Sequence, residues 1–257
     1  MCIRDRDGYL YDETRNMLMQ EFSDITIVNN IVEQIASGNN TLNTIAGKIG
    51  EKEPTVLYSL DKLISVGLVE KKKCITEEKN KKKTQYVLKD YMFKFWYEFI
   101  PKATSVIEIG QGEIYYQKAV KPILHSFMGT VFEDMCRYYT LKKGIIGEYG
   151  CFITSVGTWW GVENIKDKYG NMRTQSVDID VVALSEVDKK ALVGECKFKN
   201  EKIDKSIYET LVSRGKLLPA KYKVSKYILF SLAGYTDWVE SLSDEDVVLL
   251  TLDSIYE

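Results

Sequence analysis

The sequence predicts an α/β protein of two modules, in which a small helical module precedes a module of alternating helices and strands. Three observations predict this class. Apolar residues recur at helical spacing between residues 24 and 67, and short apolar strands separated by turns follow from about residue 119. Apolar residues make up 45% of the 257 residues and charged residues 28%, which is the balance of a folded chain long enough for two domains.

The composition excludes several classes of function. The chain has a single histidine, His125, whereas Ser-His-Asp hydrolysis, Cys-His catalysis and histidine-rich metal sites all need a histidine beside other specific groups. We expect His125 to be an ordinary helix residue. The sequence contains no G-x-x-x-x-G-K-[ST] segment and therefore no P-loop of its own. Because the net charge is −2, any nucleic-acid binding must come from local basic patches.

The cysteines predict a cytoplasmic protein. The sequence has five of them, an odd number, and no two lie at the spacing of a zinc knuckle or a redox pair. We therefore expect the thiols to act as small apolar side chains in a reducing compartment. No apolar run approaches the length of a membrane span and no signal segment opens the chain, so no membrane association is predicted.

Three helices are predicted in the first module. The first ends at Gly38 and carries an apolar face of Ile27, Val28, Ile31, Val32 and Ile35. Thr41 is the predicted N-cap of a short second helix over residues 42–49, which Gly50 ends. Pro54 begins the third helix, where its missing N–H costs nothing.

A β-hairpin is predicted next, with strands at residues 68–70 and 85–88. The order of helix, short helix, helix and hairpin is typical of a winged helix-turn-helix, whose third helix enters the DNA major groove. The exposed face of that helix would carry Lys52, Thr55, Tyr58, Ser59 and Lys62. The hairpin tip would meet phosphates through Lys71, Lys72, Lys73, Lys79, Lys81, Lys82 and Lys83.

From these sets we predict nucleic-acid contacts for Lys52, Thr55, Tyr58, Lys62, Lys72, Lys81 and Lys82. The alternative is that the module is a protein–protein spacer and that its lysine-rich loop is an ordinary solvated tip.

The predicted elements divide the chain into four segments. Residues 1–20 precede a winged-helix domain over residues 21–90. An aromatic linker helix over residues 91–118 follows, since the dense aromatic residues at its start imply burial between the two modules. Residues 119–257 form the α/β domain.

The α/β domain is predicted to have the element order α-β-β-β-α-β-β, which gives a mixed sheet with helices on its faces. Its first helix, over residues 126–142, would bury a face of Phe127, Val131, Met135 and Tyr138, with Glu133 pointing elsewhere. Residues 163–175 are predicted to be a polar loop. Strands are expected at residues 149–160, 177–184, 190–198, 227–232 and 247–252, and a second helix at residues 203–217.

Charged residues interrupt the two central strands, and a buried carboxylate requires a partner or a metal. Strand alternation places Asp178 and Asp180 on one face and Glu195 and Lys197 on one face, while Cys196 points away. If Leu184 pairs with Ala191, Asp180 lies across from Glu195 and Asp178 across from Lys197.

Two carboxylates with room for water predict a Mg²⁺ or Mn²⁺ site formed by Asp180 and Glu195. Such an ion would polarise a scissile phosphate, and Lys197 would orient the attacking water or offset the developing charge. The alternative is a structural ion pair of Lys197 with Asp178 or Glu195.

Asp180 followed by Glu195-Cys196-Lys197 resembles the PD-(D/E)XK signature of the restriction-endonuclease-like superfamily. The segments around it, Phe132-Glu133, Gly157-Thr158-Trp159-Trp160-Gly161, Asp178–Ala183 and Gly194–Phe198, resemble an uncharacterised domain at the C-terminal end of archaeal-type AAA (P-loop) ATPases. In that family a winged helix joins the ATPase to this domain, and the likeness extends from about Tyr9 onward.

The resemblance implies a restriction-endonuclease-like mixed sheet, with Asp180 and Glu195 as metal ligands and Lys197 and Glu133 as catalytic residues. It also implies that residues 1–20 are the tail of an upstream ATPase region, which would be a partner together with DNA. The sequence departs from the signature at Ile179, where the motif has proline, and at Asp178, where a glutamate is expected.

The function predicted from site and resemblance together is a metal-dependent DNA phosphodiesterase domain with a DNA-binding winged helix. The alternative is a non-catalytic DNA- or protein-binding regulatory module of the ATPase, in which the acidic cluster is inherited but idle. A third reading, a transcriptional regulator, would bind duplex DNA without needing Asp180 or Glu195.

Overall fold

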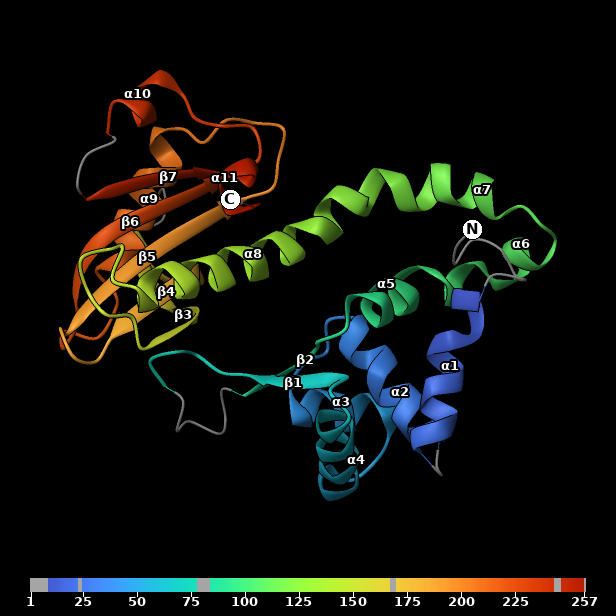
Figure 1. The fold of residues 1–257 in the computed structure, drawn as a ribbon. Coiled ribbons are helices and arrows are strands. Elements are labelled where there is room, and N and C mark those ends of the chain that lie inside the picture. Colours follow the sequence, from blue (N-terminus) through green and yellow to red (C-terminus); the bar gives the residue numbers. More distant parts are fainter. Residues whose placement is uncertain (1–8, 23–24, 78–83, 167–169, 243–245, 257) are drawn as a thin grey trace. The chain divides into compact units, whose positions relative to one another are not determined.

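The computed structural model describes residues 9–22, 25–77, 84–166, 170–242 and 246–256 (Figure 1). The chain forms two compact units. The first contains residues 1–73 and 80–124, and the second contains residues 74–79 and 125–257. The first unit is mainly helical and the second is a mixed sheet flanked by helices, which confirms the predicted fold class.

The first unit contains the predicted run of three helices and a hairpin. Its elements are α1 (Tyr9–Glu21), α2 (Ile25–Ala36), α3 (Leu42–Ile49), α4 (Glu53–Ser65), β1 (Val69–Lys72) and β2 (Gln85–Leu88). Local signals set these bounds: the Thr41 hydroxyl accepts from the backbone N–H of Thr44, and Gly50 ends α3 with φ of 73°. The antiparallel hairpin pairs Val69 with Leu88.

The core of the first unit also includes segments outside the predicted winged-helix boundaries. Leu18 of α1 is 1% exposed and Phe93 is fully buried, and both pack in the same cluster as α2 and α4. The predicted single helix over residues 91–118 is wrong, because that stretch is broken into short helical turns. These are α5 (Tyr91–Phe99), η2 (Pro101–Ala103), α6 (Thr104–Glu108), α7 (Gly112–Tyr115) and η3 (Tyr116–Val120).

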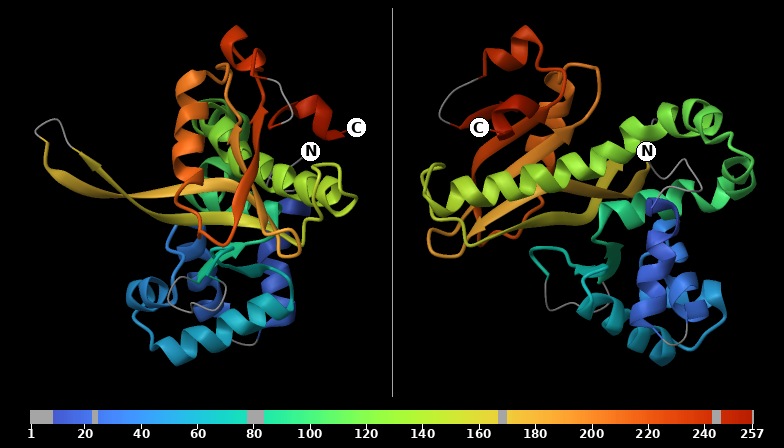
Figure 2. Two further views of the ribbon diagram at one scale, coloured as in Figure 1. Left: turned by 90° about the vertical axis from the view of Figure 1, so that its left-hand side faces the viewer. Right: turned by 45° about the vertical axis from the view of Figure 1, so that its right-hand side comes forward.

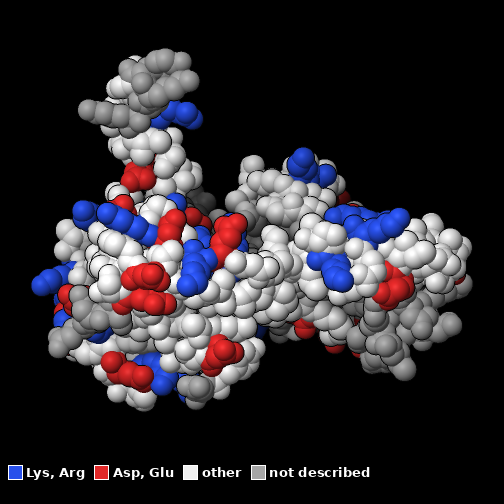
Figure 3. Space-filling model, turned by 90° about the horizontal axis from the view of Figure 1, so that it is seen from above, with Lys and Arg blue, Asp and Glu red and all other residues white. Residues whose placement is uncertain are grey.

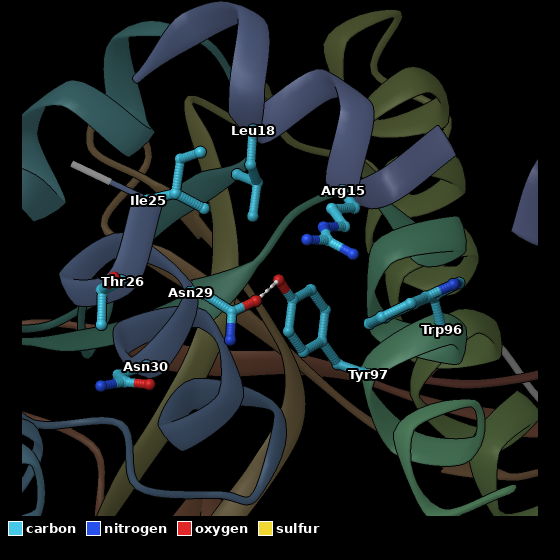
Figure 4. A pocket seen from close by; sticks show the side chains of 8 residues that line it. All are labelled: Arg15, Leu18, Ile25, Thr26, Asn29, Asn30, Trp96 and Tyr97. Carbon is cyan, nitrogen blue, oxygen red and sulfur yellow. Dashed lines mark hydrogen bonds between the residues drawn. The ribbon is translucent and has the colours of Figure 1, made fainter. Parts of the chain in front are cut away.

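A cavity of about 330 Å³ lies among α1, α2 and α5 in this unit (Figure 4). At its centre the Tyr97 hydroxyl donates a 2.7 Å hydrogen bond to Oδ1 of Asn29, which ties α5 to α2. Burial raises the pKa of Tyr97 well above its usual range, and the nearby charge of Glu33 raises it further. The hydroxyl is therefore a neutral donor at physiological pH.

The second unit is built on a five-stranded sheet in the order β3-β4-β5-β6-β7 (Figure 2). The β3–β4 and β4–β5 pairs are antiparallel, while β5–β6 and β6–β7 are parallel. The unit contains α8 (Lys121–Ile145) from His125 onward, β3 (Ser155–Lys166), β4 (Met172–Ser185), β5 (Lys190–Lys197), α9 (Lys205–Gly215), β6 (Lys223–Ser231), α10 (Asp237–Glu240), β7 (Val247–Thr251) and α11 (Leu252–Tyr256). Buried residues of α8 cover one face of the sheet, and those of α9 and α10 cover the other.

Three expectations for the second unit are wrong. Residues 163–175 are not a loop: β3 runs on to Lys166 and β4 begins at Met172, so the two strands continue as a paired ribbon (Figure 2). The first strand starts at Ser155 rather than at residue 149. The face of α8 that packs on the sheet is Phe132, Cys136 and Tyr139, displaced from the predicted face, so that Tyr138 is 72% exposed.

A β-bulge in β4 interrupts the alternation of its side chains. Gly157 pairs with Val182 and Trp159 with Ile179, so β4 has two residues, Asp180 and Val181, where β3 has only Thr158. As a result Ile179 and Val182 pack in the same apolar cluster, although strand alternation alone would place them on opposite faces. The bulge therefore aims Asp180 differently from a residue in a regular strand.

Candidate functional site

The central hairpin brings together the two residues predicted to bind a metal. Leu184 pairs with Ala191, as expected, and the same register runs to Val181 opposite Gly194, where the β4–β5 ladder ends. Asp180 and Glu195 are the next residues on each strand. Glycine at position 194 lets β5 lie close to β4 here, because a Cβ at Gly194 would lie 3.1 Å from Cβ of Val181.

Asp180 bridges the point at which the two strands separate. Its Oδ2 accepts a 2.9 Å hydrogen bond from the backbone N–H of Cys196. Burial raises the pKa of the Asp180 carboxyl to about 7, and the charges of Glu195 and Glu133 raise it in the same direction. The charges of the other two carboxylates predicted for the site therefore favour the protonated form of Asp180.

Lys197 pairs with Glu195 rather than with Asp178. Its Nζ lies 2.5 Å from Oε1 of Glu195, and the Lys197 side chain is 29% exposed while that of Glu195 is 10% exposed. Burial lowers the pKa of Lys197, but the charge of Glu195 and its hydrogen bond outweigh this and raise the pKa overall. Lys197 is thus a charged ammonium that solvent can still reach.

Glu133 reaches the site from α8 in the company of Arg137, which lies one helical turn further on. The Arg137 Nη1 atom lies 3.5 Å from Oε2 of Glu133, 3.2 Å from Oγ1 of Thr158 and 2.7 Å from the carbonyl oxygen of Asp180. Its Nη2 also donates to Asp134. Arg137 is not among the predicted site residues, although its position four residues after Glu133 is typical of a helical ion pair.

Asp178 stands apart from the other acidic residues of the site. Its side chain is 64% exposed and lies 3.7 Å from Arg214 of α9, whose Nη1 donates a 2.8 Å hydrogen bond to the backbone carbonyl of Asp178. Asp178 was expected to lie across from Lys197, but its partner is Arg214, a residue that no sequence signal singled out.

The Gly157–Gly161 segment shapes the strand beside the site. A Cβ at Gly161 would lie 2.6 Å from the Trp159 ring, so glycine is needed for that ring to be buried. A Cβ at Gly157 would lie 3.3 Å from the Ile75 side chain. The backbone N–H of Ile75 donates a 3.1 Å hydrogen bond to the carbonyl of Thr158, so residues 74–77 are a further support of β3.

The residues can supply carboxylate oxygens for a metal ion. Among the described residues no group of three or more potential ligands is close enough to hold one. Mg²⁺ typically takes one or two carboxylates, with water and substrate oxygens completing its shell. Asp180 and Glu195 each use one oxygen in the hydrogen bonds given above, so the donor set fits such a partly hydrated ion.

The residues predicted to contact nucleic acid are only partly described. Lys52, Thr55 and Lys62 are exposed, and Tyr58 is 64% exposed with Nζ of Lys62 4.5 Å from its ring centre. Ser59 was expected on the same face but is 9% exposed and belongs to the buried side of α4. Lys72 is half-buried. The hairpin-tip lysines Lys79, Lys81, Lys82 and Lys83 lie outside the described residues.

Basic and acidic side chains are interspersed on the face drawn in Figure 3. This agrees with the small net charge of −2. His125, for which no catalytic role was predicted, packs against Phe198 in a tilted arrangement with ring centres 4.8 Å apart. Cys74, Cys136, Cys151 and Cys196 are free and buried, as expected for apolar thiols.

The comparisons with known proteins place the site inside a recognised region of sequence. Residues 96–207 match the family DUF234, described as archaeal and bacterial proteins of unknown function. This range contains Glu133, Asp180, Glu195 and Lys197. The chain is also 28% identical over 253 residues to an uncharacterised protein, MJECL04, of Methanocaldococcus jannaschii.

That alignment covers 98% of this chain but 53% of the archaeal protein, so the chain spans about half the length of the curated relative that it matches. No solved structure matches the chain. Across the described residues, no helix has the length and apolar character required to cross a membrane.

Proposed function

We propose that the second unit is a metal-dependent phosphodiesterase that acts on DNA and that the first unit is a winged helix that holds the DNA. The observation that carries this proposal is the position of Asp180 and Glu195 at the point where β4 and β5 separate. A solvent-accessible ammonium, Lys197, lies beside them. Two carboxylates and a cation at one strand end are the groups that metal-assisted phosphate hydrolysis uses.

In this proposal Asp180 and Glu195 hold a Mg²⁺ or Mn²⁺ ion, and Glu133 orders water at its edge. The ion, when bound, supplies Lewis acidity toward the phosphate and toward a water molecule. Lys197 donates hydrogen bonds to the developing phosphate oxyanion, and its positive charge stabilises the negative charge there. Since its pKa is raised, Lys197 does not act as the base that removes the proton from water.

The second candidate is a non-catalytic regulatory module that binds DNA or protein. It is favoured by the 2.5 Å contact between Lys197 and Glu195, because a lysine satisfied by an ion pair already has a structural role. The two candidates differ in metal binding: the enzyme must bind a divalent ion through Asp180, whereas the idle module need not.

We further propose that the chain works as the C-terminal part of a larger cytoplasmic protein with an upstream P-loop ATPase. The length of the archaeal relative, which this chain covers over 53%, leaves room for such a domain. ATP hydrolysis in that domain would then control access of DNA to the site.

Cleavage of single- and double-stranded DNA in Mg²⁺ or Mn²⁺ tests the proposal. We expect cleavage by the wild type and a loss of at least about a hundredfold in Lys197→Ala and Asp180→Asn. Asp178→Asn is the matched control, because its side chain is 64% exposed two residues from Asp180. If this chain cleaves neither substrate, the assay is repeated on the full-length protein with ATP. If that protein also leaves both substrates intact, the regulatory module is the correct function.

A further inference from the structure

Strand β4 is held by arginine side chains where it has no ladder to β5. That ladder begins only at Val181. The carbonyl oxygens of Asp178 and Asp180 accept hydrogen bonds of 2.8 Å from Arg214 and 2.7 Å from Arg137. The two guanidinium groups come from α9 and α8, the helices on opposite faces of the sheet.

Arg137 is itself fixed from several sides. Its side chain is 13% exposed, and besides the Asp180 carbonyl it contacts Glu133, Asp134 and Oγ1 of Thr158. Thr158 is the β3 residue opposite the bulge. A guanidinium presents its donors in a rigid planar fork, so one arginine can hold both strands of the bulge in a single geometry.

The bulge determines where the Asp180 carboxylate points, because the extra residue in β4 has no partner of its own in β3. The backbone hydrogen bond from Arg137 sets the carbonyl of Asp180, and the 2.9 Å bond from the Cys196 N–H sets its side chain. A carboxylate fixed at both ends is preoriented for a ligand.

We propose that Arg137 is a positioning residue that orients Asp180 for divalent-metal binding. This inference rests on the proposed function, since it requires that Asp180 binds a metal. Arg137 contacts the backbone carbonyl of Asp180 and not its carboxylate. The guanidinium therefore does not compete with the ion for the carboxylate oxygens.

Charge and geometry predict opposite effects when Arg137 is changed. If the guanidinium acted only through its charge, it would repel a metal ion, and Arg137→Gln would tighten metal binding. If it positions Asp180, both Arg137→Gln and Arg137→Lys weaken binding, because lysine keeps the charge but lacks the planar fork. The sign of the change therefore distinguishes the two roles.

The test is Mn²⁺ affinity, measured by calorimetric titration of the full chain at a temperature well below the unfolding midpoint of each variant. We expect Arg137→Gln and Arg137→Lys to weaken Mn²⁺ binding by about 10- to 100-fold, as the loss of a group supporting a metal ligand typically does. Thr158→Val, which removes an acceptor of Arg137 at nearly constant volume, should weaken binding several-fold in the same direction.

Two controls separate the outcomes. Val239→Ala shortens a fully buried side chain of the same unit in α10, and it should keep wild-type affinity. An equal loss in this variant would mean that Arg137 acts only through stability and would overturn the inference. Unchanged or tighter binding in the Arg137 variants would also overturn it, while wild-type affinity in Asp180→Asn would refute the metal site itself.

Discussion

The Asp180 carboxyl is buried beside two other carboxylates, and its pKa of about 7 makes folding depend on pH. Between the ordinary aspartate pKa and 7 the folded protein keeps a proton that the unfolded chain has lost. Stability contributed by this group is therefore fully present at low pH and declines as pH rises to about 7, above which it is constant. Without metal, Asp180 opposes folding at pH 8.

Asp180→Asn should remove this dependence. The amide keeps an acceptor for the Cys196 N–H but carries no charge, so we expect the variant to gain on the order of 4 kcal/mol relative to the wild type at pH 8. The gain should nearly vanish at pH 4. Urea unfolding in EDTA at both pH values measures it, with Asp178→Asn as the control. An equal gain at the two pH values would contradict the burial of an ionisable Asp180.

The elements show how far local sequence determines structure. The bounds of α3 and β2 were predicted without error, because Thr41, Gly50 and the short apolar run Gln85–Leu88 act over a few residues. The ribbon at residues 163–166 and 172–175 was missed because its described side chains are exposed or half-buried, and such a pair of strands can be as polar as a loop. Only pairing between distant residues makes it a strand.

The candidate site was predictable in the part that local sequence patterns determine. Asp180, Glu195 and Lys197 interrupt apolar strands, and hairpin register brings them together. Arg137 and Arg214 were missed because their hydrogen bonds to the carbonyls of Asp180 and Asp178 leave no trace in the sequence. The spacing of Glu133 and Arg137 indicates only a helical ion pair. The face of α8 was misassigned because apolar residues occur on two adjacent stripes, and the sheet selects the one with Phe132 and Cys136.

The hydrogen bond between Tyr97 and Asn29 joins α5 to α2 and should contribute to the free energy of unfolding. Tyr97→Phe leaves Oδ1 of Asn29 without its donor in a half-buried position, so we expect a loss of about 1–2 kcal/mol in the free energy of unfolding. Tyr58→Phe is the matched control, since Tyr58 is 64% exposed. Urea denaturation monitored by tryptophan fluorescence compares them, and equal effects would show that the bond contributes nothing measurable.

At the scale of the whole molecule, the division into units does not follow the order of the chain. Residues 74–79 lie in sequence between the hairpin strands of the first unit, yet they belong to the second unit. Ile75 is 8% exposed in the apolar cluster that contains Trp159 and Val177. The hairpin segment therefore contributes to the stability of the sheet that carries the candidate site.

Ile75→Ala tests this division. Removing the side chain leaves a cavity against Gly157, and we expect the second unit to lose about 2–4 kcal/mol. In hydrogen-exchange mass spectrometry β3 and β4 should lose protection, while α2, α3 and α4 keep theirs. Ile45→Ala, which shortens a fully buried residue of the first unit's core, should give the reverse pattern. If Ile75→Ala instead loosened α2–α4 and left β3 protected, residues 74–79 would belong energetically to the first unit, and the site would not depend on them.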